Sequence, residues 1–127
     1  MTDEELVAEV KRHWEHWAGH LGITNWWISF EGKKKTKDYN MEILFNQEGY
    51  LRATILVANN PIDWWHYGIE FNVLHETLHV LYHQPSRFVK HSLSSELYGE
   101  FLQFEEAHVD ALTSIIWRLH EQTGCKL

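Results

Sequence analysis

Residues 72–82 read Asn72-Val73-Leu74-His75-Glu76-Thr77-Leu78-His79-Val80-Leu81-Tyr82, and this stretch decides most of what the chain can be. Its two histidines are four positions apart, which is the spacing of neighbours on one face of a helix, and apolar residues surround them. Both imidazoles therefore reach one metal ion if the stretch is helical. Glu76 projects about 100° around the helix from His75, where its carboxylate can take a proton from a water that the metal activates.

The chemistry of this HExxH pattern favours zinc. Zinc accepts two imidazoles and one carboxylate tetrahedrally and leaves a fourth position for water, whose pKa it lowers from about 15.7 toward 7. We therefore expect one zinc ion per chain, held by His75 and His79, with Glu76 as the general base of amide hydrolysis. The alternative is an accidental match on a surface helix, which the apolar flanks disfavour.

A third ligand must come from another helix, because three positions on one straight helix converge poorly on a tetrahedral ion. The segment 104–110 offers four candidates: Glu105, Glu106, His108 and Asp110. Glu105 shares the apolar face of its helix with Leu112, whereas Glu106 lies about 120° away. A carboxylate on an apolar face needs a partner such as a metal, so the sequence predicts Glu105 as the third ligand. Glu106 stays an alternative because it forms a Glu-x-x-x-Asp pattern with Asp110, and so do His108 and Asp110.

The first half of the chain predicts a helix followed by a three-stranded sheet. Thr2 precedes Glu5 by three residues, which is the spacing of a capping box, and the helix is expected to end near Gly19 or Gly22. Alternating apolar and polar residues then predict strands at 28–31, 39–46 and 51–57. Gly49 marks a hairpin turn between the last two strands.

The second half predicts two long helices. One runs from about residue 64 to residue 83 and stops before Pro85, because proline lacks the N–H that a helix interior needs. The other runs from residue 94 or 95 to residue 123, with Gly124 as its C-terminal cap. The expected fold class is therefore α+β. Because no repeat or linker divides the 127 residues, we expect a single domain over residues 1–127.

Composition narrows the classes of function. Eleven Lys and Arg against 18 Asp and Glu give a net charge of -7, which is the wrong sign for binding a phosphate backbone. No apolar run approaches the roughly 20 residues of a spanning helix, and the acidic N-terminus is unlike a secretory signal. Cys125, the only cysteine, has no partner for an internal disulfide. We expect a soluble, cytoplasmic protein that binds neither nucleic acid nor membrane.

Three further clusters have ordinary structural interpretations. The lysine-rich run 33–37 predicts a solvated turn that discourages edge-to-edge sheet pairing. His83 is expected to reach solvent or the rim of a cleft. The adjacent Trp26 and Trp27 face opposite sides of a strand, so an exposed ring that anchors a partner is one interpretation, but core packing is the favoured one because each ring buries a large area. Three histidines of the first helix predict a solvated face: His13, His16 and His20.

The chain resembles the gluzincin metallopeptidases in their smallest form, the minigluzincins, and also short phage-encoded proteins that carry an HExxH motif. The matching segments are LHETLHVL at 74–81 and EEAHVDAL at 105–112, and the predicted order of elements agrees. The resemblance implies a zinc peptidase that acts on a peptide or protein substrate. It also implies that the strand before the zinc helix, residues 51–57 here, pairs with an extended substrate.

Other families with related motifs do not fit. A metzincin needs Gly and His where this chain has Tyr82 and Pro85. A peptide deformylase needs a cysteine upstream of the motif, whereas Cys125 lies near the C-terminus, and the HxxxHxxxxxH endoribonucleases need histidine at Pro85. The alternative from another class is a catalytically silent, zinc-stabilised protein-binding module of phage or mobile-element origin with a Trp-rich surface.

Overall fold

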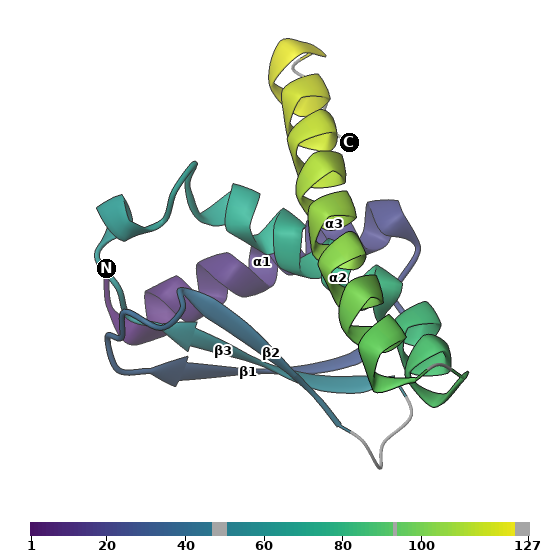
Figure 1. Cartoon of the computed structure of the whole chain (residues 1–127). Helices are drawn as coiled ribbons and strands as arrows, with labels where there is room; N and C mark the ends of the chain where they lie inside the picture. The colour runs from purple at the N-terminus through teal and green to yellow at the C-terminus, as the bar shows by residue number, and fades with distance from the viewer. Residues whose placement is uncertain (47–50, 93, 124–127) are drawn as a thin grey trace.

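The computed structural model describes residues 1–46, 51–92 and 94–123, with the backbone alone for 84–92 and 123 (Figure 1). Its elements are α1 (Asp3–Leu21), β1 (Trp27–Lys33), β2 (Met41–Phe45), β3 (Arg52–Ala58), the 3-10 helix η1 (Ile62–Trp64), α2 (Ile69–Ser92) and α3 (Ser95–Thr123). The predicted α+β fold is confirmed. The Gly49 turn, the Gly124 cap and Cys125 lie outside the described residues.

The first helix begins and ends at its capping residues. The Glu5 N–H donates to the Thr2 hydroxyl at 3.1 Å, and the Thr2 N–H donates to the Glu5 carboxylate at 3.1 Å. This reciprocal pair satisfies two N–H groups that the helix itself leaves unbonded. At the other end Gly22 adopts φ 73°, a left-handed conformation that glycine accepts without strain. Of the two predicted ends, Gly22 is therefore the correct one.

The strands form a mixed sheet in the order β1-β3-β2. β3 pairs with β1 in parallel and with β2 in antiparallel orientation, so that Ile55 faces Phe30 on one side and Ile43 on the other. The predicted pairing of the last two strands is confirmed. The expectation that residues 51–57 pair with a substrate is wrong, because the central strand already uses its backbone groups on both sides.

Two apolar clusters hold the layers together. α1 and α2 lie over one face of the sheet, and α3 packs on α2 (Figure 1). The cluster between the sheet and the helices includes Leu6, Val10, Trp14, Ile55, Val57, Trp65 and Val73. A smaller cluster joins the three helices through Trp17, Leu74, Leu78 and Val109. Burial of each such side chain contributes about 1.5–3 kcal/mol, so the smaller cluster fixes α3 firmly against α2.

Both ends of α2 differ from the predicted helix at 64–83. The helix begins only at Ile69, because Tyr67 and Gly68 form a left-handed turn with φ values of 65° and 91°. It also continues past Pro85 to Ser92, so the predicted stop is wrong. Proline in a helix interior costs about 3 kcal/mol, which is a penalty and not a prohibition. No helix in the described part of the chain has both the length and the hydropathy to cross a membrane.

Candidate metal centre

Side chains from two helices converge at one point between α2 and α3. They belong to His75, His79 and Glu106, the one such group among the described residues. The Nε2 atoms of the two histidines are 3.2 Å apart, and Glu106 oxygens lie 3.0 Å from Nε2 of His79 and 3.4 Å from Nε2 of His75. Two ligands of a tetrahedral zinc, each about 2.0–2.1 Å from the ion, are roughly 3.4 Å apart. Two imidazoles and a carboxylate at this spacing fit a zinc ion.

The packing of α2 explains why the two histidines share this position. Leu74 and Leu78 each precede a histidine by one residue, and both are fully buried against α1 and α3. The next position around the helix therefore lies at the rim of that contact. There the two imidazole rings stand one turn apart with their centres separated by 4.9 Å. Their side chains are about one-fifth exposed, at 21% for His75 and 19% for His79.

Glu105, the predicted third ligand, lies beside this group and not in it. Its side chain is 11% exposed, so it does face inward as the helical periodicity predicts. Its carboxylate is 3.7 Å from Nδ1 of His79, the other ring nitrogen. Glu106 is 54% exposed and still reaches both Nε2 atoms. Choosing Glu105 from the sequence assumed that the metal centre lies inside the apolar core. The two histidines meet instead at the rim of a cleft, where the more exposed Glu106 reaches them.

A carboxylate stands next to Nδ1 of each histidine. Oδ1 of Asp110 is 3.4 Å from Nδ1 of His75, and Glu105 has the corresponding place at His79. A carboxylate at this position favours the tautomer that carries its proton on Nδ1, which leaves Nε2 available to a metal. The other alternative ligand, His108, lies outside the group because its Nδ1 is 3.0 Å from the hydroxyl of Tyr82.

The electrostatics of the centre follow from burial beside many acidic groups. Burial, with smaller contributions from the charges of Glu106 and Glu42, raises the pKa of Glu76 to about 8. Burial lowers the pKa of the His79 imidazole against the opposing effect of Glu106, which favours the neutral ring that metals bind. Burial also raises the pKa of Glu105, and the charge of Glu106 adds to this. A divalent cation in the centre would favour the ionised carboxylates.

A cavity of about 320 Å³ opens beside the group. Among the residues that line it are His75, Glu76 and Asp110 from the centre, together with Asn40 and His66 from two loops. Glu76 therefore borders the same open space as one metal-binding histidine. Sequence reasoning did not find Asn40 or His66, because they precede β2 and α2 in irregular segments that carry no periodic signal.

The other histidines differ in part from expectation. His83 is half-buried, and its ring stacks on Phe45 of β2 with centres 3.8 Å apart and planes at 10°. His20 is exposed as predicted. The predicted solvated face is wrong for His13, whose side chain is 13% exposed, and for His16, whose Nε2 is buried. Trp27 is 73% exposed, so the favoured interpretation of this tryptophan as a core residue is wrong and the exposed alternative is the correct one.

No protein-family model matches this chain, and no curated protein or solved structure does so either. The chemistry of the site is therefore inferred from its own geometry.

Proposed function

We propose that this chain is a zinc-dependent peptidase of the gluzincin type, with His75, His79 and Glu106 as the metal ligands. The observation that carries this proposal is the triangle of two Nε2 atoms and one carboxylate at 3.0–3.4 Å. A zinc ion bound there supplies a water of lowered pKa, near 7, and a charge that polarises the scissile carbonyl.

Glu76 moves the proton in this proposal. It follows His75 directly and borders the same cavity, so its carboxylate faces the space in which water and the substrate carbonyl meet. It takes the proton of the attacking water and passes it to the departing amine nitrogen. Glu105 and Asp110 act on the histidines instead, by holding each ring with its Nε2 toward the metal.

An extended peptide is the substrate that fits the cleft. Met41, the first residue of β2, lines the cavity beside His75 and Glu76. In the described sheet no strand pairs with the outer edge of β2. A peptide can add to such an edge through backbone hydrogen bonds, which bind many sequences alike. We therefore assign to β2 the backbone pairing with substrate that the resemblance implied for residues 51–57.

Cleavage of a proteome-derived peptide library, followed by mass spectrometry with zinc present, tests this function. Glu76→Gln should retain zinc and lose cleavage by a factor of about 10²–10⁴, the usual contribution of a general base. Glu100→Gln removes an exposed carboxylate elsewhere on α3 and should cleave at the wild-type rate. Zinc binding without cleavage by the wild type would overturn the peptidase proposal.

A zinc-stabilised protein-binding module is the second candidate, and the exposed aromatic residues favour it. Trp27 is 73% exposed and Tyr67 is 77% exposed. An exposed tryptophan can anchor a partner protein. If this candidate is correct, Glu76→Gln leaves partner binding intact while Trp27→Ala weakens it.

A further inference from the structure

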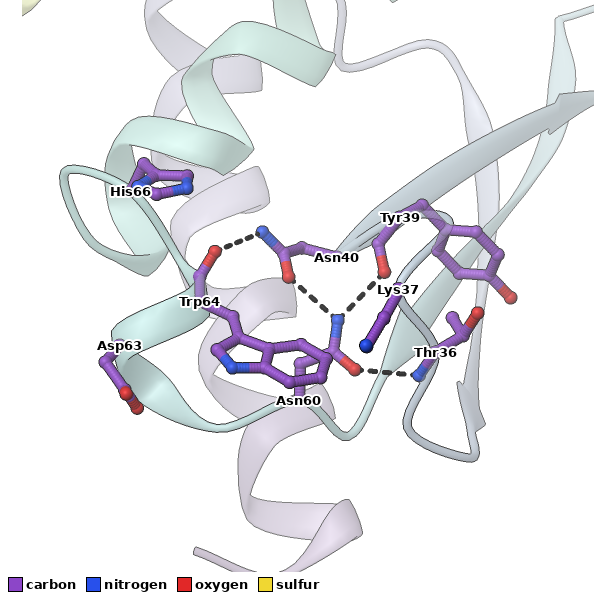
Figure 2. A pocket seen from close by; sticks show the side chains of 8 residues that line it. All are labelled: Thr36, Lys37, Tyr39, Asn40, Asn60, Asp63, Trp64 and His66. Carbon is purple, nitrogen blue, oxygen red and sulfur yellow. Dashed lines mark hydrogen bonds between the residues drawn. The ribbon is translucent and has the colours of Figure 1, made fainter.

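A second cavity, of about 540 Å³, adjoins the one beside the metal centre (Figure 2). Both cavities are lined by Asn40 and His66, so they form one groove that extends from His75 to Trp64. We call its far end the Trp64 pocket. The connection between β1 and β2 forms one wall of this pocket, and η1 with the turn after it forms the other.

Asn60 holds these two walls together. It is 6% exposed, and its Nδ2 donates to Oδ1 of Asn40 at 2.8 Å and to the carbonyl of Tyr39 at 2.9 Å. Its Oδ1 accepts from the N–H of Thr36 at 2.9 Å, and Nδ2 of Asn40 donates to the carbonyl of Trp64 at 3.0 Å (Figure 2). The asparagines are thus engaged in holding the backbone, and the pocket is preformed around them.

The wall that carries His66 is fixed in a similar way. Nδ2 of Asn72, in the first turn of α2, donates to the carbonyl of His66 at 2.9 Å and to that of Gly68 at 2.7 Å. Hydrogen bonds from asparagine side chains therefore fix the backbone of both walls where the two cavities meet. A rigid groove can discriminate between ligands because it does not adapt to a poor one.

The two ends of the groove differ in the charged side chains that surround them. Five carboxylates surround the metal end: Glu42, Glu76, Glu105, Glu106 and Asp110. At the other end Lys37 lines the Trp64 pocket, and Nζ of Lys35 is 4.8 Å from the centre of the Trp64 ring. With zinc bound, the cation offsets the carboxylates at the metal end, so the attraction at the lysine end is the one that the groove's own side chains exert on a carboxylate of a bound peptide.

Lys37 is the lysine that lines this pocket, and Lys35 lies over the Trp64 ring beside it. Lys33, at the other end of the lysine run, pairs with Glu31 at 3.3 Å, whereas no described carboxylate lies within ion-pair distance of Lys37. Asp63 also lines the pocket, and Figure 2 shows its carboxylate on the far side of Trp64 from Lys37 and directed away from the asparagines. The inner part of the pocket thus combines an ammonium group with an indole ring.

We propose that the Trp64 pocket binds a carboxylate of the substrate peptide, with Lys37 as the recognising cation and Trp64 as the surface on which the peptide packs. This inference rests on the proposed peptidase function for the presence of a peptide in the groove. The carboxylate belongs either to an Asp or Glu side chain or to a free C-terminus. In both cases the ion pair with Lys37 holds one part of the peptide at the far end of the groove.

Binding of short N-acetylated alanine peptides to the Glu76→Gln protein with zinc present tests this inference without cleavage. One Glu is placed at each position in turn, each peptide has a Gln twin, and each is made with a C-terminal amide and with a free carboxylate. Affinity is followed by the indole N–H resonance of Trp64, assigned with Trp64→Phe. An exposed ion pair should make the acidic peptides roughly three- to fivefold tighter at one position, or at the free C-terminus.

Lys37→Gln should abolish this advantage. Lys34→Gln is the matched control, because it replaces an exposed lysine of the same run that does not line the pocket, and it should keep the advantage. Equal affinity of Glu and Gln twins together with no effect of the free carboxylate would overturn the inference, and so would equal effects of the two lysine variants. Each peptide also has a Lys twin, and tighter binding of the Lys twins would overturn the inference and assign the pocket to Asp63. If the wild type cleaves the peptide library without a preference for acidic residues, the carboxylate pocket is wrong and the peptidase function stands. If peptides bind with a carboxylate preference but none is cleaved, the peptidase function is wrong and the pocket stands.

Discussion

Two helices of this protein carry histidines one turn apart, and among the described residues only the pair on α2 forms a candidate metal centre. The rings of His75 and His79 on α2 have centres 4.9 Å apart, and those of His16 and His20 on α1 are 4.7 Å apart. The spacing within each helix is therefore the same. What differs is that α3 brings the carboxylate of Glu106 within 3.4 Å of both imidazoles on α2.

In the part of the chain that the structure describes, the pair on α1 has no such third group. The carboxylate of Glu70, whose charge acts on His16, lies 3.8 Å from His13 and 3.7 Å from His120. Among the described residues, no set of three ligand atoms around the α1 pair lies within the 4.8 Å that the α2 group satisfies. Two histidines four residues apart on one helix supply two metal ligands. A metal site forms only where a second helix adds a third ligand.

Removing one histidine from each pair should give the largest difference in zinc binding between the two helices. His79→Ala is expected to reduce bound zinc from one ion per chain to none, with a loss of affinity above about 100-fold. His20→Ala, which removes an exposed imidazole from the other pair, should leave the zinc content unchanged. Elemental mass spectrometry after dialysis against trace zinc measures both, and zinc lost from His20→Ala alone would reverse the comparison.

The next largest effect should separate the two neighbouring glutamates. Glu106→Gln is expected to weaken zinc binding about 100-fold, because the amide loses the charge that the metal neutralises. Glu105→Gln should weaken it only about tenfold, since this residue acts through His79. Competition with a chromophoric chelator gives both affinities. The opposite order would restore Glu105 as the third ligand.

Asp110 should have an effect of similar kind through His75. Asp110→Asn removes the charge that lies 3.4 Å from Nδ1 and should lower zinc affinity by about 10- to 100-fold. Asp38→Asn, an exposed change in the loop before β2, is the control and should bind zinc normally. The same chelator competition applies, and equal affinities for the two variants would remove Asp110 from the centre.

Zinc binding should release about one more proton from the wild type than from a variant without the Glu76 carboxyl. The pKa of about 8 means that this carboxyl is mostly protonated at pH 7 before the cation lowers it. Calorimetric titration at pH 7 in buffers of different ionisation enthalpy should therefore show nearly one more proton released by the wild type than by Glu76→Gln. Equal release would mean that Glu76 is already ionised in the metal-free protein.

The smallest effect should come from the buried ring of the α1 pair. Burial lowers the pKa of His16 below its usual value of 6.5, and the charge of His20 adds to this. Because the folded state disfavours the proton, the stability from the neutral ring is present above pH 6.5 and is lost as the pH falls below it. His16→Gln should therefore slightly reduce the drop in urea midpoint between pH 7 and pH 5.5. Equal drops in the wild type and in His16→Gln would contradict this expectation.

Local features of the fold could be predicted from the sequence, whereas the order of the strands could not. The Thr2 capping box and the Gly22 end of α1 depend on residues a few positions apart, which the sequence displays directly. Alternation identified the strands and their apolar faces. It does not say which strand is central, because all three strands have an apolar face of the same kind, and tertiary packing placed β3 between the others.

By itself, the sequence determined that His75 and His79 share one face of a helix and that Glu76 stands beside them, because helical geometry relates residues four and one apart. Only the tertiary structure decided which carboxylate of residues 105–110 joins them. Periodicity gives the angle between Glu105 and Glu106 but not the direction in which the neighbouring helix lies. That direction is set by the burial of Val109 against α2, which turns Glu106 toward both Nε2 atoms.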